Sequence, residues 1–253
     1  MSLLALRNID VDLSGVSILR DISFEVEPGQ TFGIVGPNGA GKTTILNVIS
    51  GLVHPIGGDV VFKDSSILGV TPHRVPRLGI GRSLQSTSYF ADLTVLNLVA
   101  LGGLKNSVWG ALTYKDHRRT TFSPRARRSE AMESLELLGL ERYANRPLHE
   151  LSTAVQKLVD MARALAVGTD LLLLDEPTSG VSAKERRIIS DALTRVRSLG
   201  RAVVLIDHDP GFVIDNCERL MAMNFGRVLH IGEPGEVMAS PEVKQSYLGA
   251  AAE

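Results

Sequence analysis

A glycine-rich segment between a short apolar strand and a helix constrains the fold more than any other feature of this chain. The strand is predicted over residues 31–35, the helix over 43–49, and the segment between them reads Gly36-Pro37-Asn38-Gly39-Ala40-Gly41-Lys42-Thr43. It matches the phosphate-binding pattern G-x-x-x-x-G-K-[ST] in full, and a chance match in a chain this long has odds of roughly one in a hundred. Glycines let successive backbone N–H groups face one anion, beside the positive end of the helix. Lys42 would contact the β- and γ-phosphates and the Thr43 hydroxyl would bind Mg²⁺. The sequence therefore predicts a nucleotide site.

Two acidic residues follow a second apolar strand, predicted over residues 171–174. Ligand sites of parallel sheets form at the carboxyl ends of the strands, which is where these acids lie. Asp175 is expected to hold Mg²⁺ through a water molecule, and Glu176, pointing elsewhere, is expected to polarise the attacking water. The alternative is that paired acids merely end a strand in solvent. The glycine-rich segment favours the first interpretation.

Two further polar residues are candidates for the same site. His208 follows a third apolar strand, predicted over residues 202–206. A lone histidine is usually structural, but a neighbouring strand of one sheet would bring this ring near the γ-phosphate. Gln85 lies where the core meets a helical region, and its amide is a candidate contact for Mg²⁺ and water. On position alone, a plain surface glutamine fits equally well.

The order of the predicted elements indicates the fold class. Apolar strands alternating with helices imply an α/β core with a parallel sheet covered on both faces. From about residue 94 to residue 168 the pattern contains no good strand, and helices are predicted to begin at Thr94, Ser123-Pro124 and Ser152. We therefore expect a helical subdomain inserted into the α/β core.

Composition limits the partners of the chain. The 27 basic and 28 acidic residues leave a formal net charge of −1, which gives no global electrostatic case for nucleic acid and leaves a local basic patch as the alternative. A single cysteine, Cys217, excludes an internal disulfide and is read as a packing residue. About 18 consecutive apolar residues are needed to span a bilayer, and no such run is present. Any membrane role is therefore expected to come through a partner.

In this order and spacing, the motifs resemble the ATP-binding cassette of ABC transporters over essentially the whole chain. The resemblance implies an ATPase with a P-loop (RecA-like) core, an N-terminal antiparallel β subdomain and an inserted helical subdomain. It divides one nucleotide-binding domain, residues 1–253, into a core (1–87 and 158–253) and a helical signature subdomain (88–157). ATP and Mg²⁺ are the implied cofactors. Within the superfamily the chain is similar to the larger cassette of branched-chain amino acid uptake systems, with urea and lipopolysaccharide transport as alternatives.

The resemblance also assigns residues. The implied catalytic residues are Glu176, His208, Gln85 and Lys42. The implied metal ligands are Thr43, Gln85 and Asp175. The implied nucleotide-binding residues are Gly36, Pro37, Asn38, Gly39, Ala40, Gly41, Lys42, Thr43, Thr44, Leu13 and Ser152, the last acting on the ATP of a partner cassette.

Four residues, in three parts of the chain, depart from the family pattern. In the signature motif, Leu151-Ser152-Thr153-Ala154-Val155, Ala154 replaces a glycine and Val155 a glutamine. A methyl group at Ala154 is expected to hold the opposing γ-phosphate away, so Ala154→Gly is expected to raise turnover. Ser182 is shorter than the usual residue of the loop after the acidic pair, and Leu13 stands where an adenine-stacking aromatic is expected.

These departures suggest how the chain pairs. The resemblance implies a second ABC cassette and transmembrane permease subunits as partners, on the cytoplasmic face of the cell membrane and without nucleic acid. The altered signature favours a heterodimer with one strong and one weak ATP site, a homodimer being the alternative. Two other functions compete: a nucleotide sensor with little hydrolysis, and a soluble ABC ATPase that acts on ribosomes or DNA.

Overall fold

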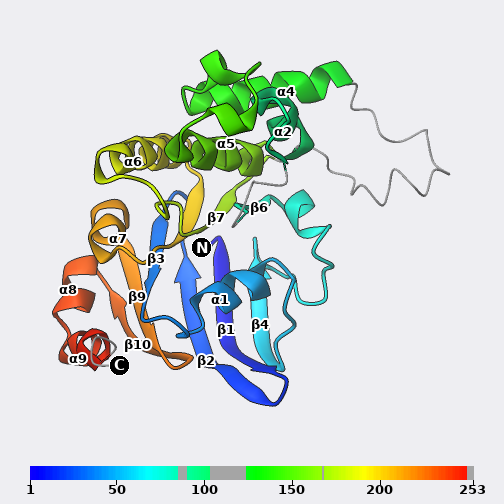
Figure 1. Cartoon of the computed structure of the whole chain (residues 1–253). Helices are drawn as coiled ribbons and strands as arrows, with labels where there is room; N and C mark the ends of the chain where they lie inside the picture. The colour runs from blue at the N-terminus through cyan, green and yellow to red at the C-terminus, as the bar shows by residue number, and fades with distance from the viewer. Residues whose placement is uncertain (85–89, 103–123, 167, 250–253) are drawn as a thin grey trace.

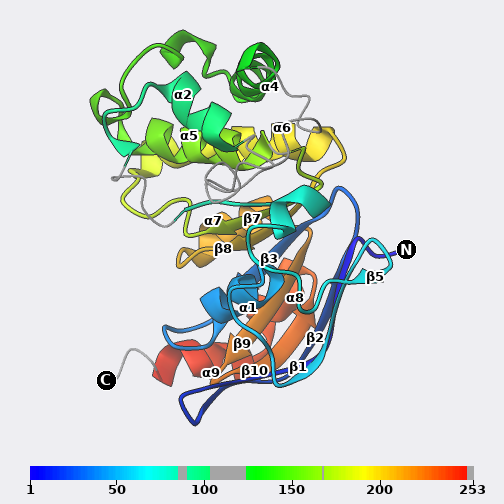
Figure 2. The ribbon, with the colours of Figure 1, turned by 90° about the vertical axis from the view of Figure 1, so that its right-hand side faces the viewer.

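The computed structural model describes residues 1–84, 90–102, 124–166 and 168–249. It has two lobes: the upper one in Figure 1 consists of helices, and the lower one holds two sheets with further helices packed beside them. Figure 2 shows the same arrangement from the side, with α5 and α6 lying between the outer helices and the strands. The predicted α/β class is confirmed. The site residues come almost entirely from the sheet lobe and from the end of one helix above it.

The central sheet has six strands in the order β10-β9-β3-β8-β7-β6. They are β10 (Arg227–Gly232), β9 (Arg219–Asn224), β3 (Thr31–Val35), β8 (Ala202–Ile206), β7 (Leu171–Asp175) and β6 (Ile80–Arg82). All neighbours pair in parallel except β9 and β10. Strands β3, β7 and β8 are buried at every position, which explains why each reads as a continuous apolar run.

The N-terminal sheet is antiparallel and has the order β2-β1-β4-β5. Its strands are β2 (Val16–Val26), β1 (Leu4–Leu13), β4 (Gly57–Phe62) and β5 (Ser65–Ser66). Helix α1 (Lys42–Ile49) and the 3-10 turn η1 (Val75–Leu78) join this sheet and the central sheet in one apolar cluster. The side chains of Phe24 and Phe32 stack across it with ring centroids 4.9 Å apart. The predicted antiparallel β subdomain is therefore present.

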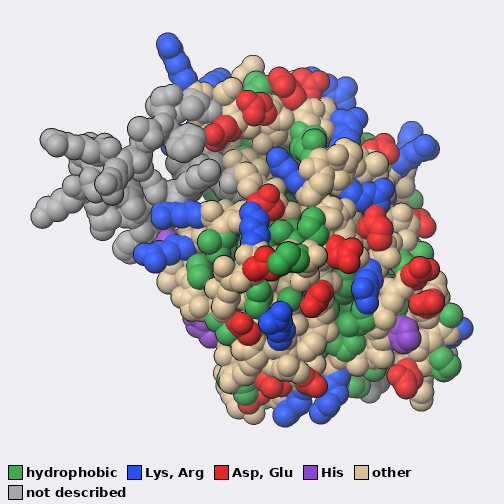
Figure 3. All heavy atoms as spheres, turned by 180° about the vertical axis from the view of Figure 1, so that it is seen from behind, with side chains coloured by type: hydrophobic (Ala, Val, Ile, Leu, Met, Phe, Trp, Pro, Cys, Tyr) green, Lys and Arg blue, Asp and Glu red, His purple; other side chains and the backbone are tan. Residues whose placement is uncertain are grey.

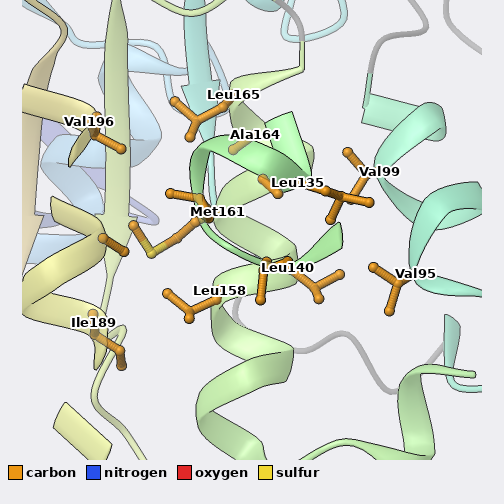
Figure 4. Close-up of a cluster of buried hydrophobic side chains, with 14 of the residues drawn as sticks. Val95, Val99, Leu135, Leu140, Leu158, Met161, Ala164, Leu165, Ile189 and Val196 are labelled. Carbon is orange, nitrogen blue, oxygen red and sulfur yellow. The ribbon is translucent and has the colours of Figure 1, made fainter. Parts of the chain in front are cut away.

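The upper lobe consists of α2 (Val95–Gly102), α4 (Pro124–Leu137), η3 (Glu141–Tyr143), η4 (Leu148–Glu150) and α5 (Thr153–Leu165). The helix starts expected at Thr94, Pro124 and Ser152 agree with these bounds to within one residue. Figure 4 shows the cluster that joins them, in which Val99 lies beside Leu135 and Val95 faces Leu140. The expected boundary between the helical subdomain (88–157) and the core (158–253) falls inside helix α5. The division of the chain into subdomains therefore stays a proposal.

The remaining helices cover the central sheet. They are α6 (Ala183–Ser198), α7 (Pro210–Asn216), α8 (Pro234–Ala239) and α9 (Pro241–Gly249). Helices α7 to α9 close a third apolar cluster against β3 and β9, and Cys217 packs there. Burial raises the pKa of the Cys217 thiol well above its usual range, because the charged thiolate is disfavoured in that environment. This agrees with the prediction that Cys217 is a packing residue.

The C-terminal hairpin supports the glycine-rich segment. The turn between β9 and β10 lies against it, with the N–H of Gly226 donating to the carbonyl of Ala40 at 3.1 Å. The carbonyl of Gly226 in turn accepts from the N–H of Arg20 on β2 at 2.8 Å. The glycine-rich segment is thus bonded to the turn between β9 and β10, and that turn is bonded to β2.

Candidate nucleotide site

Parallel pairing brings the ends of four strands to one edge of the central sheet. Ile34 on β3 pairs with Ile206 on β8, Ile206 with Asp175 on β7, and Leu173 with Arg82 on β6. The residues that follow these strands therefore lie side by side, although up to 170 positions of sequence separate them. This edge is where a nucleotide site was predicted.

The segment after β3 has a conformation that requires glycine. Gly36, Gly39 and Gly41 have φ angles of 155°, 80° and 97°. A Cβ on Gly36 would lie 2.2 Å from the carbonyl oxygen of Met223, and one on Gly41 would lie 2.6 Å from the Cδ2 atom of Leu19. Two of the three glycines are thus fixed by close packing as well as by backbone angle.

Lys42 closes the loop. Its Nζ atom donates to the carbonyls of Gly36 and Pro37, both at 2.8 Å. Burial lowers the pKa of this ammonium from its ordinary value, and the carboxylates of Glu176 and Asp175 oppose that shift. The first turn of α1 contains Lys42, Thr43 and Thr44, so no acidic side chain of that turn offsets the positive helix end. The arrangement suits an anion within the loop.

Thr43 and Asp175 meet beneath the loop. The Thr43 hydroxyl donates to Oδ1 of Asp175 at 3.4 Å, and Asp175 is only 4% exposed. The N–H of Asp175 donates to the Ser83 hydroxyl at 3.2 Å, which fixes the strand end. A hydroxyl and a carboxylate oxygen are both hard ligands that suit Mg²⁺, which keeps several waters and takes its other ligands from phosphate. These two residues fit the predicted metal role, and that role is a proposal.

Glu176 points away from Asp175. It has a φ of 51°, a left-handed conformation that is costly for a residue with a side chain. Its N–H is fixed by the carbonyl of Ile206 at 2.8 Å, and its carbonyl accepts from Ser179 at 3.1 Å. The side chain is exposed while that of Asp175 is buried. The strained backbone thus directs one acid into the protein and the next toward the surface beside Lys42.

His208 is held next to a buried aspartate that sequence reasoning missed. Asp207 accepts hydrogen bonds from the hydroxyl and N–H of Thr178 at 2.7–3.0 Å and from the N–H of Asp209 at 3.0 Å. The Nδ1 atom of His208 lies 3.5 Å from Oδ1 of Asp207, and the histidine side chain is 54% exposed. Thr178 follows β7 and Asp207 follows β8, so this pair joins the two strand ends that carry Glu176 and His208.

The remaining predicted residues are more dispersed. Leu13 lies at the end of β1, is 43% exposed and pairs with Val16. Pro37 and Thr44 are half-buried and Asn38 is exposed. The Ser182 hydroxyl donates to Glu185 at 2.7 Å. Gln85 lies outside the described residues.

The signature motif requires a correction. Ser152 occupies the N-cap position of α5, but its exposed hydroxyl interacts with Glu185 instead of capping its own helix. Ala154 is 0% exposed and belongs to the apolar cluster of the upper lobe. Its methyl group therefore faces the protein interior, so the expectation that it would hold an opposing phosphate away is wrong. Spacing alone did not reveal which side of the helix start this residue faces.

We expect Ala154→Gly to destabilise the protein and to leave turnover unimproved. The change removes a buried methyl group and places glycine in the first turn of a helix, which together cost about 1–2 kcal/mol. Thermal unfolding and the ATPase rate of the variant would check this expectation. A faster rate at unchanged stability would restore the steric role of the methyl group.

Comparisons with known proteins agree with the geometry. The family model described as ABC transporter matches residues 19–179. The chain is 29% identical to the high-affinity branched-chain amino acid transport ATP-binding protein LivG of Escherichia coli K12, over 98% of each chain. It is 31% identical to BraF of Pseudomonas aeruginosa, described in the same words, again over 98% of each.

Solved structures show the same likeness. An ATP-binding cassette of an ABC transporter in its ADP conformation superposes with a TM-score of 0.87 at 28% identity, covering 98% of this chain and 99% of the other. A dimeric cassette in a post-hydrolysis state with ADP and Pi superposes with a TM-score of 0.74 at 26% identity, covering 91% and 98%.

Proposed function

Because this chain belongs to the ABC transporter family and is an ATP-binding, ATP-hydrolysing subunit, we propose that it drives an importer of branched-chain amino acids. The likeness to LivG and BraF along nearly the whole chain supports this cargo. Urea and lipopolysaccharide remain the alternative cargoes. The observation that carries the hydrolytic role is the meeting of Lys42, Thr43 and Asp175 at one sheet edge, with Thr43 and Asp175 3.4 Å apart.

The residues of this edge divide the chemistry among them. Loop N–H groups and the start of α1 would bind the phosphates, and Lys42 would exchange its two carbonyl partners for phosphate oxygens. Thr43 and Asp175 would hold Mg²⁺, which neutralises charge on the transferring phosphoryl group. Glu176 would accept the proton of the attacking water, and His208 would hold that water or the γ-phosphate. The sensor alternative is disfavoured because both Glu176 and His208 are in place.

The second cassette would complete the site. Ser152 and Thr153 are exposed at the start of α5, so this helix end is accessible to a phosphate bound on a partner. The Ser152 hydroxyl would exchange Glu185 for that phosphate. We favour a heterodimer, because Val155 replaces the glutamine of the signature motif and Ser182 is shorter than the usual residue of its loop. With the steric role of Ala154 removed, the asymmetry rests on these two residues. A homodimer is the alternative.

The permease would dock between the two lobes. A pocket of about 240 Å³ lies there, lined by residues of both lobes that include Leu52, Pro76 and Leu101 together with Arg82 and Arg163. Leu52 is 58% and Leu101 42% exposed, so the rim of the pocket offers apolar surface to a partner. We propose that a cytoplasmic helix of the permease fills this pocket.

Membrane attachment would then be peripheral. In the parts of the chain that the structure describes, every helix is too short or too polar to cross a bilayer. On the face shown in Figure 3, acidic and basic side chains are interspersed, which fits a protein partner better than nucleic acid. We therefore place the chain on the inner face of the cell membrane, bound to its permease.

The cargo can be tested in proteoliposomes that contain the permease, the second cassette and this chain. We expect leucine and isoleucine to accumulate when MgATP is present in the compartment that the cassettes face. Omission of this chain should abolish that accumulation. Urea serves as the competing cargo. ATP-driven uptake of urea without leucine would overturn the proposed substrate class while leaving the ATPase role intact.

A further inference from the structure

Arg82 lies between the helix of the phosphate loop and the buried acid of the site. Its Nη1 atom donates to Oδ1 of Asn47 at 2.8 Å and to the hydroxyl of Ser50 at 2.7 Å, both near the end of α1. Its Nη2 atom lies 3.8 Å from Oδ2 of Asp175. The other oxygen of Asp175 faces Thr43. The two carboxylate oxygens thus have different neighbours, which defines the orientation of the group.

The backbone around Arg82 is held from the upper lobe. Arg163 on α5 donates through Nη2 to the carbonyl of Arg82 at 2.8 Å, and Asp160 accepts from the N–H of Leu84 at 2.6 Å. Asp160 and Arg163 also pair with each other at 2.7 Å, with their side chains 3% and 17% exposed. Burial raises the pKa of Asp160, and Arg163 opposes the shift. A buried ion pair is costly unless its hydrogen bonds are met, and here both partners bond to the same short segment.

These contacts form one continuous path. Helix α5 carries Ser152 at its start and the Asp160–Arg163 pair farther along. The pair bonds to the backbone of residues 82–84. Within that segment, the Ser83 hydroxyl accepts from the N–H of Asp175, and the Arg82 guanidinium faces the Asp175 carboxylate. Any shift of α5 relative to the central sheet therefore reaches Asp175 through backbone and side chain together. Both arginines also line the pocket between the lobes.

We propose that Arg82 is a positioning residue for Asp175, and that the Asp160–Arg163 pair transmits the position of α5 to it. The planar fork of arginine can bond Asn47, Ser50 and Asp175 in one fixed geometry, which a lysine cannot reproduce. Mg²⁺ demands near-ideal geometry from its ligands, so a misaligned carboxylate would weaken it. The inference rests on the proposed magnesium role of Asp175.

Two substitutions separate positioning from charge. We expect Arg82→Lys and Arg82→Gln to raise the Kd of MgATP by about tenfold, as is usual when a group that orients a metal ligand is lost. Fluorescence titration of the full chain with a labelled ATP, in magnesium and in EDTA, measures this. The Kd in EDTA should stay within about twofold of wild type, because the loop is unaltered. Wild-type affinity in the lysine variant would show that charge alone suffices and would overturn the proposal.

The direction of the effect is also informative. Removing a positive charge near a divalent cation favours binding of that cation on electrostatic grounds alone. Tighter MgATP binding by Arg82→Gln would therefore contradict positioning. If the wild-type protein binds ATP equally tightly in magnesium and in EDTA, the proposed metal role of Asp175 is wrong. That outcome differs from one in which magnesium strengthens binding and the variants match wild type. Asn47→Ala removes one acceptor of Arg82 and should raise the Kd of MgATP by about threefold. This variant replaces the Arg82 variants as the test if those unfold.

The link to α5 has its own test. We expect Asp160→Asn to raise the MgATP Kd by about three- to fivefold with the EDTA value unchanged, since the amide cannot hold Arg163 as the carboxylate does. Arg146→Gln, which breaks an exposed ion pair with Glu150 in the same lobe, is the matched control and should match wild type. If Asp160→Asn and Arg146→Gln have equal Kd values for MgATP, transmission through Asp160 is refuted.

Discussion

Glu176→Gln is expected to lower ATP hydrolysis by about a hundredfold or more, the usual loss when a positioned general base is removed. The amide keeps the size of the side chain but cannot accept a proton. Asp175, Thr43 and the loop are unaltered, so the affinity for ATP should stay within about twofold of wild type. Steady-state phosphate release by the assembled cassette pair and equilibrium ATP binding would check both halves.

The same change in the partner cassette tests the proposed asymmetry. If the pair has one strong and one weak site, Glu176→Gln in this chain and its counterpart should depress hydrolysis unequally. Glu150→Gln, at an exposed position of the upper lobe, controls for loss of a carboxylate and should retain full activity. Equal losses in the two cassettes would remove the case for functional asymmetry, and unchanged hydrolysis would remove Glu176 from the proposed mechanism.

Gly36→Ala should abolish nucleotide binding under ordinary assay conditions. The new Cβ would lie 2.2 Å from the Met223 carbonyl oxygen, so the loop must move away from β9. Charge-assisted hydrogen bonds contribute about 1.5–3 kcal/mol each, so misplacing two loop N–H groups predicts at least about a hundredfold weaker ATP affinity. Calorimetric titration with ATP measures the loss directly.

A matched glycine distinguishes this effect from general strain. Gly200 has a φ of 71°, and a Cβ there would meet no described atom within 4 Å. Gly200→Ala therefore carries the cost of a left-handed residue, about 1–2 kcal/mol, without a clash. It should lower thermal stability and bind ATP normally. Normal ATP binding by Gly36→Ala would show that the loop tolerates displacement from β9.

Local sequence patterns predicted the parts of the site that lie next to each other in the chain. The buried strands read as apolar runs, and the loop and acid pair follow them directly, so strand and motif could be located together. Strand β2 was harder. Its burial alternates strictly only over residues 21–26, because Asp21 has a φ of 51° and the pairing with β1 shifts register nearby. The strand in fact begins at Val16.

Contacts between distant residues lay beyond such patterns. Arg82 meets Asn47 across 35 positions, and Thr178 meets Asp207 across 29. Nothing in the sequence near either residue indicates its partner. Ala154 shows a different difficulty, since the direction in which its side chain points depends on how α5 packs on the rest of the lobe. Motif spacing identifies which residues share a site, whereas packing decides which way each one faces.

The support of the phosphate loop by the C-terminal hairpin has a consequence for synthesis of the chain. A ribosome completes the glycine-rich motif early, but the carbonyl of Ala40 gains its partner only when Gly226 has emerged, and β3 gains its neighbours β8 and β9 equally late. We therefore expect a chain that ends before Gly226 to carry the motif without this support. The phosphate-binding motif and the turn that holds it in shape are thus made at different times, and we expect nucleotide binding only once both are present.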